Sequence, residues 1–267
     1  MPKHSRKWDE TVYRRYLREG RGQGVGANYT PWLRIQDFPS TGMVSRVRGA
    51  KTGRIHHLMS NLETSFFFIL DWSDNVLDIR EQYPMLDIRQ IIEIAESAQI
   101  KYPYDHKSGF PYIMTSDFFI ETLDGPVIVT VKTTSDLENP RTREKLEIER
   151  RYWQSRNIKW SVVTENEINT TKAKNIEWLT QAKDLEWFGI PKHMQESCIL
   201  YFGTHYGGNV NLCELLTEVE MEFNLTAGAG LNIYKHMAYR KLIEFDIGKA
   251  IDFTEFTRCD AVYNIGA

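Results

Sequence analysis

Residues 117–132 read DFFIETLDGPVIVTVK, and this stretch decides the fold. β-branched and aromatic residues fill both flanks, whereas the middle, Asp124-Gly125-Pro126, has the composition of a short turn. The pattern predicts a β-hairpin whose first strand begins at Asp117 and whose second strand ends at Lys132. Because an antiparallel hairpin brings the start of one strand beside the end of the other, we expect this acid and this lysine to be neighbours at one end of a buried sheet.

An aspartate beside a lysine suits phosphodiester chemistry. Carboxylate and carbonyl oxygens are the ligands that Mg²⁺ prefers, and an ammonium group can stabilise negative charge on a phosphate or position a water. The order acid, hairpin, apolar run and lysine resembles the skeleton of the PD-(D/E)XK nucleases. Their usual second acid lies two residues before the lysine, where this chain has Thr130. The missing carboxylate must come from elsewhere, and the alternative is an ordinary hairpin with a surface aspartate and an extended lysine.

Composition describes a folded protein of one large domain or two smaller ones. The chain has 267 residues, of which 42% are hydrophobic and 12% aromatic, and its net charge is −3. A DNA partner therefore requires a local basic patch, since the whole chain is not basic. Cys198, Cys213 and Cys259 are widely spaced, which argues against a zinc site and against a disulfide framework. Without a signal peptide or a long apolar span, we expect a cytoplasmic protein that does not enter a membrane.

The N-terminal region contains a helix, a glycine-rich loop and a basic stretch. Residues 9–19 have helical spacing, and the glycines of 20–26 follow a helix rather than a strand, which excludes a phosphate-binding loop. We expect a mobile loop that is either a linker or a contact to the DNA backbone through Arg18 and Arg21. Residues 44–57 predict a hairpin that is either simply solvated or contacts phosphates without base specificity. Its candidate DNA-binding residues are Arg48, Lys51, Arg54 and His57.

Glu63 has two interpretations. Ser60 and Glu63 have the spacing of a capping box at the start of an apolar helix, Phe66–Trp72. In that case Glu63 only stabilises the helix. The other interpretation is that Glu63 supplies the carboxylate that Thr130 lacks, from a helix packed on the sheet.

The remaining elements predict an α/β core, a mixed β-sheet flanked by helices. Strands are expected at 76–80 and 159–163, and helices at 87–100 and from Pro140 to about Gln154. Glu149 lies on the long helix that follows the lysine strand. One face of that helix must approach the site, although charge runs are usually solvated.

After Thr164 the sequence changes character, which predicts domains 1–166 and 167–267. A helix that contains Ile176, Trp178 and Leu179 is expected to follow Glu167–Asn169. Further helices are expected over 191–202, 211–223 and 228–242, and a strand over 243–247. Three helices and a terminal strand pair resemble a winged-helix domain, and the alternative is a helical bundle used for docking. Trp187 and Tyr234 are expected to be exposed.

Many segments in order resemble the TnsA family, the endonuclease subunits of heteromeric cut-and-paste transposases of Tn7-type elements. They cover most of residues 19–180 and become sparse in the C-terminal third. The segments are Glu19–Gly24 with Tyr29 and Pro31–Leu33, Lys51–Leu58, Leu62-Glu63, Val76–Pro84, Ser116–Phe118, Val131-Lys132, Glu144–Trp153, Glu167–Asn169 and Asn175–Leu179.

The resemblance implies a restriction-endonuclease-like fold, a winged-helix-like C-terminal domain, and Mg²⁺, with Mn²⁺ as a substitute. It also implies a catalytic triad of Glu63, Asp117 and Lys132, in which the two acids bind the metal. This role raises Glu63 above a simple helix cap.

The family tolerates a residue other than an acid, commonly Gln, at the position of Thr130. With Thr there, we expect the backbone carbonyl of Thr130 or Val131 to be a metal ligand. Glu149 is a further candidate, either for a second metal or as a neighbour of the ligands.

In this family the subunit nicks the 5′ ends of the element, in double-stranded DNA at the transposon ends. A DDE transposase subunit, TnsB, cuts and joins the 3′ ends, and an AAA+ ATPase regulator, TnsC, binds the C-terminal part. A protein with these partners is associated with the nucleoid during transposition. Two alternatives are a free-standing restriction or repair endonuclease, which should cut DNA alone, and a non-catalytic DNA-binding adaptor, which should have lost the triad.

Overall fold

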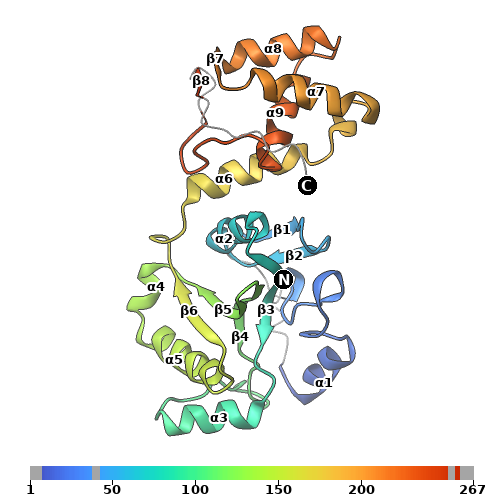
Figure 1. The fold of residues 1–267 in the computed structure, drawn as a ribbon. Coiled ribbons are helices and arrows are strands. Elements are labelled where there is room, and N and C mark those ends of the chain that lie inside the picture. Colours follow the sequence, from blue (N-terminus) through green and yellow to red (C-terminus); the bar gives the residue numbers. More distant parts are fainter. Residues whose placement is uncertain (1–7, 38–42, 252–255, 259–267) are drawn as a thin grey trace, which may run out of the picture. The chain divides into compact units, whose positions relative to one another are not determined.

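The structure is a computed structural model that describes residues 8–37, 43–251 and 256–258. The chain divides into two compact units, Met1–Ile168 and Asn169–Ala267 (Figure 1). Each unit has hydrophobic clusters of its own.

A four-stranded sheet with the order β3-β4-β5-β6 forms the centre of the first unit. Its strands are β3 (Val76–Pro84), β4 (Thr115–Thr122), β5 (Gly125–Val131) and β6 (Lys159–Val163). The pairs β3–β4 and β4–β5 are antiparallel, and β5–β6 is parallel. The prediction of a mixed sheet is therefore confirmed. A parallel pair needs a crossover connection, which contains α4 (Thr134–Glu138) and α5 (Pro140–Gln154).

The predicted hairpin is β4–β5, and it determines where the site lies. Its turn consists of Leu123 and Asp124, one residue earlier than predicted, and Gly125 follows with a φ of +106° that disfavours any side chain. The register pairs Phe118 with Val129. Residues 117 and 130 are the next positions along the two strands, so both lie at the open end of the hairpin.

Helices cover both faces of this sheet, as Figure 1 shows. On one face, α2 (Asn61–Trp72) packs against a cluster that contains Phe118. On the other face, α3 (Ile88–Ser97) and α5 pack against a cluster that contains Phe119 and Ile128. Consecutive residues of β4 enter different clusters because side chains alternate along a strand.

The N-terminal region of this unit adds α1 (Glu10–Arg18), two short 3-10 turns, and the hairpin of β1 (Ser45–Arg48) and β2 (Ile55–Leu58). The helix and the hairpin were both predicted. The aromatic rings of Trp8, Trp32 and Tyr16, the last of which lies on α1, pack edge to face.

The glycine-rich loop of residues 20–26 is anchored, contrary to the expectation of a mobile loop. The guanidinium of Arg21 is buried, donates a hydrogen bond to the carbonyl of Trp32 at 3.1 Å, and pairs with Asp37. Its charge is thus used inside the protein, and the expected contact of Arg21 with DNA is wrong.

The second unit is mostly helical. Its elements are α6 (Thr170–Leu179), 3-10 turns at Thr180–Ala182 and Leu185–Phe188, α7 (Lys192–His205), β7 (Gly208–Asn211), α8 (Leu212–Glu222), α9 (Ala229–Tyr239) and β8 (Phe256–Arg258). Strands β7 and β8 pair antiparallel. The four predicted helices are confirmed. The predicted strand at 243–247 is wrong: this segment has no regular structure, and Ile243, Phe245 and Ile247 join the core instead.

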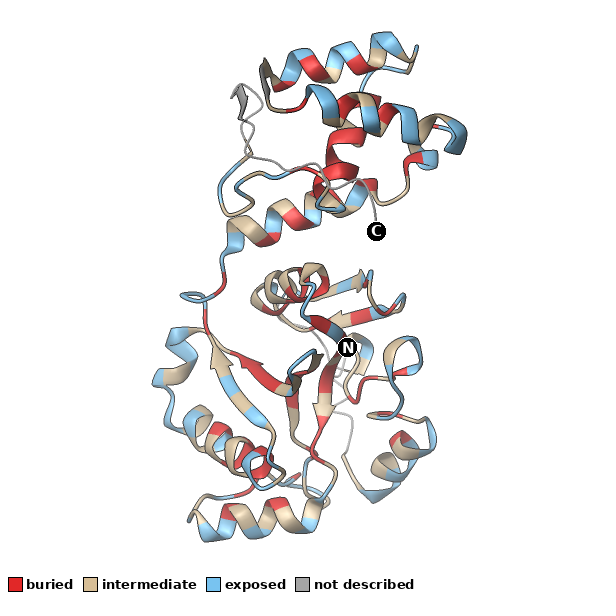
Figure 2. Cartoon of the chain, in the orientation of Figure 1, coloured by how far each residue is buried: buried red, intermediate tan, exposed pale blue. Residues whose placement is uncertain are grey.

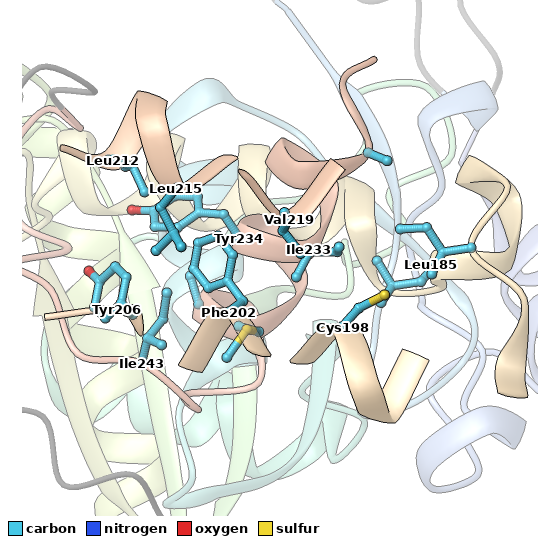
Figure 3. Close-up of a cluster of buried hydrophobic side chains, with 14 of the residues drawn as sticks. Leu185, Cys198, Phe202, Tyr206, Leu212, Leu215, Val219, Ile233, Tyr234 and Ile243 are labelled. Carbon is cyan, nitrogen blue, oxygen red and sulfur yellow. The ribbon is translucent and has the colours of Figure 1, made fainter. Parts of the chain in front are cut away.

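Helix α9 is the centre of this core, and Figure 2 shows that most of it is buried. Figure 3 shows Phe202 and Tyr234 among the aliphatic side chains of the cluster. Tyr234 is only 2% exposed, so the expectation that it lies at the surface is wrong, whereas Trp187 is 78% exposed as predicted. Within the described part of the chain, no helix has the length and apolar character to cross a membrane.

Candidate functional site

The end of the β4–β5 hairpin brings an acid and a lysine together, as the sequence predicts. The ammonium Nζ of Lys132 lies 2.9 Å from Asp117 Oδ2. The same carboxylate oxygen accepts a hydrogen bond of 2.8 Å from the main-chain N–H of Val131. The alternative of a solvated aspartate is wrong, because Asp117 is buried and held by the facing strand.

Two oxygens converge on a single positive group at this point. The ammonium of Lys132 donates to Asp117 Oδ2 and to the carbonyl oxygen of Val131, at 2.9 Å in each case. Carboxylate and main-chain carbonyl oxygens are ligands of the type that bind hard divalent cations. The two oxygens around the Lys132 ammonium therefore fit a cation.

Glu63 caps α2 and also belongs to the charged cluster. Its main-chain N–H donates to Ser60 Oγ at 3.1 Å, and its carboxylate accepts from the N–H of Met59 at 3.0 Å and from the Ser60 hydroxyl at 3.2 Å. Burial, together with the charge of Asp117, raises the pKa of Glu63 to about 8, against the opposing effects of the Met59 N–H, the Lys132 charge and the Ser60 hydroxyl. The helix-cap interpretation is therefore confirmed, and the role of Glu63 as a metal ligand stays a prediction.

Glu149 reaches the sheet from α5 and is 4% exposed. Its Oε1 accepts a hydrogen bond of 2.5 Å from the hydroxyl of Thr130. Burial raises the pKa of Glu149 to about 7, and hydrogen bonds from Ser116 and Thr130 oppose this rise, whereas the charge of Asp117 adds to it. A carboxyl group on α5 therefore contacts the strand position at which the nuclease skeleton has its second acid.

The charges of this cluster do not balance within the protein. Burial lowers the pKa of Lys132, but the charge and hydrogen bond of Asp117, together with Glu63 and Glu149, raise it above its ordinary value. One ammonium faces three buried carboxyl groups, and burial together with the charge of Asp117 keeps the pKa values of Glu63 and Glu149 raised. Nevertheless, among the described residues no three His, Cys, Asp or Glu side chains are close enough to hold a metal by themselves.

The basic stretch divides into inward and outward residues. Arg54 pairs through both terminal nitrogens with buried Glu81, and the Arg54 side chain is only 8% exposed. Burial would raise the pKa of Glu81, but hydrogen bonds from Arg54 and His56 lower it to about 2. Arg54 thus attaches the hairpin to β3, and its expected role in DNA binding is wrong.

His57 also faces the protein. Its Nδ1 accepts the main-chain N–H of Ile35 at 3.3 Å, and burial lowers its pKa, so it is neutral at physiological pH and offers no positive charge to a phosphate. Arg48 is exposed on β1, next to the loop that carries half-exposed Lys51. Of the four candidates, Arg48 is exposed and Lys51 and His57 are half-exposed, but among these three only Arg48 and Lys51 are positively charged at physiological pH.

Two hydrogen-bonded groups at the site were not predicted. The indole N–H of Trp153 donates to the hydroxyl of Ser116 at 2.8 Å, one residue before Asp117. Glu165 accepts from the main-chain N–H of Thr134, just beyond Lys132, at 2.9 Å. Both are contacts between distant segments, and no local pattern in the sequence indicates them.

Comparisons with known proteins identify the family of this chain. A model of the TnsA-like endonuclease N terminal matches residues 73–165, and a model of the TnsA endonuclease C terminal matches residues 167–247. The chain is 38% identical over 255 residues to the transposon Tn7 transposition protein TnsA of Escherichia coli, across 94% of this chain and 91% of that protein. The first match contains Asp117 and Lys132, and Glu63 precedes it. The chain therefore belongs to the TnsA family of transposition endonucleases.

Proposed function

We propose that this endonuclease hydrolyses the phosphodiester at the 5′ ends of a transposon, in a reaction that requires Mg²⁺ and accepts Mn²⁺. Residues 1–166 form the restriction-endonuclease-like catalytic domain in this proposal. Residues 167–267 form a winged-helix-like domain that docks a partner or DNA. The product is a nicked end with its 5′ strand released from the flanking DNA.

The observation that carries the proposal is the convergence of Asp117 Oδ2 and the Val131 carbonyl on one positive group. Mg²⁺ is usually held in proteins by one or two carboxylates and keeps several waters for substrate phosphates. A site in which the protein supplies only part of the ligand shell is consistent with this mode of Mg²⁺ binding. Asp117, Val131 and Glu63 would hold the metal, and Glu149 is the candidate for a second ion.

Bound Mg²⁺ would lower the pKa of a water and neutralise charge on the phosphate under attack. The protein's own residues do the remaining work. Asp117 keeps its orientation through the N–H of Val131, so its free lone pairs point to a fixed place. Lys132 is charged at neutral pH and can transfer its two hydrogen bonds from protein oxygens to a phosphate oxygen.

Arg48 and Lys51 would contact the DNA backbone. Phosphate contacts fix the register of a duplex on a protein without reading its sequence. The β1–β2 hairpin is suited to this role because Arg54 and Glu81 attach it firmly to β3 of the catalytic sheet.

The partners in this proposal are a DDE transposase, TnsB, that acts on the 3′ ends, and an AAA+ regulator, TnsC. The C-terminal unit would dock the regulator. Trp187 supports this assignment because a large aromatic side chain with 78% exposure is a typical anchor of a protein interface.

The test is nicking of a duplex with a transposon end by the purified chain, with both partners and Mg²⁺. We expect a nick at the 5′ end that requires all three proteins and is abolished by EDTA. The matched variants are Asp117→Asn and Lys132→Met, which keep the side-chain size. Cleavage by the chain alone would favour a free-standing nuclease, and full activity of both variants would refute the assignment.

A further inference from the structure

Thr130 lies where the nuclease skeleton has its strand acid, and its hydroxyl has a defined partner. It donates to Glu149 Oε1 at 2.5 Å, and Thr130 is 2% exposed. A hydrogen bond to a carboxylate is among the stronger ones in proteins, particularly away from water. Thr130 therefore does more than fill space at this position.

The position of Thr130 on the strand relates Glu149 to the acid of the hairpin. The residue after Thr130 is Val131, whose N–H binds Asp117 Oδ2 at 2.8 Å. Two consecutive residues of β5 thus hold two different carboxylates, one through a side chain and one through the main chain. The spacing of Glu149 from Asp117 is set by this single strand segment.

A second hydroxyl supports the same carboxyl group from β4. Trp153 donates its indole N–H to Ser116 Oγ at 2.8 Å, so the hydroxyl proton of Ser116 is available to another acceptor. Ser116 is fully buried and lowers the pKa of Glu149. The indole N–H of half-buried Trp160 also lowers this pKa, although this buried nitrogen has no partner in hydrogen-bond geometry among the described residues.

We propose that Thr130 is a positioning residue which, with Ser116, holds the helix carboxylate of Glu149 at the place that a strand acid would occupy. This inference rests on the proposed function, since it assigns Thr130 a part in the same metal-dependent site. Thr130 acts through Glu149 and itself provides neither charge nor a side-chain ligand.

The inference predicts that the effects of Thr130 and Glu149 are coupled. Thr130→Val removes the hydroxyl with nearly the same shape, whereas Thr130→Ser keeps the hydroxyl. We expect Thr130→Val to reduce single-turnover nicking about 10- to 100-fold, the scale of one hydrogen bond to a charged group, and Thr130→Ser to stay near wild type. In a Glu149→Gln background, Thr130→Val should add less than about twofold, because there is no carboxylate left to position.

A second measurement does not depend on activity. Calorimetric titration of the full chain with Ca²⁺, which replaces Mg²⁺ as a non-catalytic probe, should show weaker binding for Thr130→Val and Glu149→Gln alike. The double variant should resemble either single variant. Melting temperatures identify any variant that fails to fold, and Ser116→Ala provides an independent hydroxyl deletion with the same expected direction.

The outcomes separate the two proposals. Wild type that does not nick a transposon end would overturn the proposed function, and the Ca²⁺ titrations would still measure the coupling. Wild type that nicks, with Glu149→Gln inactive and Thr130→Val normal in nicking and Ca²⁺ affinity, would overturn the positioning role alone. Independent, multiplicative effects of the two substitutions would also overturn it.

Discussion

Ser60 and Glu63 cap each other at the first turn of α2. The N–H of Glu63 donates to Ser60 Oγ at 3.1 Å, and the Ser60 hydroxyl donates to Glu63 Oε1 at 3.2 Å. The carboxylate of Glu63 is therefore fixed in orientation while Asp117 and Lys132 act on it electrostatically. Substitutions can therefore separate the role of Glu63 as a helix cap from its proposed role as a metal ligand.

Glu63→Gln should separate them. Gln keeps an oxygen for the N–H of Met59, and its amide NH₂ can donate to Ser60 Oγ where the carboxylate accepted from that hydroxyl, so the cap survives. We expect the melting temperature to stay level or rise, because a buried carboxylate beside Asp117 is removed, while nicking falls by at least about 100-fold, the loss of a few kcal/mol of transition-state stabilisation. The matched control is Ser60→Ala, which should cost about 0.5–2 kcal/mol of stability and leave nicking largely intact. Near-normal nicking by Glu63→Gln would show that Glu63 is only a cap.

The stability of the metal-free protein should fall as pH rises from about 4.5 to 8. Glu63 and Glu149 have folded pKa values of about 8 and about 7, above the ordinary value of 4.5. Between the ordinary and the folded pKa of each group the folded state binds more protons than the unfolded state, so each pH unit removes on the order of 1 kcal/mol of stability per group. Glu81 has a lowered pKa and contributes only below about pH 4.5.

Urea unfolding in EDTA at pH 5, 6, 7 and 8 measures this slope. Glu63→Gln should flatten it, and Asp117→Asn should flatten it partly, because the charge of Asp117 raises the pKa values of Glu63 and Glu149. A slope equal to wild type in Glu63→Gln would mean that Glu63 is not a buried titrating group.

The sequence predicts the hairpin with its acid and lysine, since periodicity and turn composition are local signals. It places Glu149 on the correct helix but not its hydroxyl partner, because the contact of Thr130 with Glu149 depends on how α5 packs. Arg54 was assigned to DNA because clustered charges look alike in a sequence, and only the buried Glu81 distinguishes it from Arg48. The strand expected at 243–247 failed because its alternating apolar residues enter a helical core.

Substitution by alanine should affect stability at Arg54 and DNA binding at Arg48. Arg54→Ala leaves Glu81 buried without its main partner, which should cost about 3–5 kcal/mol of stability. Arg48→Ala should change stability by less than about 0.5 kcal/mol. It should weaken binding of any duplex and reduce the salt dependence of that binding by about one unit of slope. Urea unfolding and duplex titrations at several salt concentrations measure both, and a stable Arg54→Ala variant with weak DNA binding would reverse the two roles.

The contacts of the segment after β6 show where the first unit ends. Thr164 donates from its N–H and its hydroxyl to Glu167, each at 2.7 Å, and Ile168 is buried in the cluster under α2. Residues 164–168 are thus part of the first unit, and the boundary expected after residue 166 removes an apolar anchor. We expect a fragment 1–168 to fold and a fragment 1–166 to be less stable by about 2–5 kcal/mol, the cost of losing one large buried aliphatic side chain.

Ile168→Ala in the longer fragment is the matched control and should reproduce most of that loss without shortening the chain. Wherever they are folded, fragments 1–166 and 1–168 should bind Ca²⁺ as the full chain does, since Asp117 and Val131 lie within them. Neither fragment should bind the regulator. Thermal unfolding compares the three proteins, and a pull-down with the regulator tests the docking. Equal stability of fragments 1–166 and 1–168 would mean that Ile168 is not an anchor, and regulator binding by fragment 1–168 would locate the docking surface in the catalytic unit.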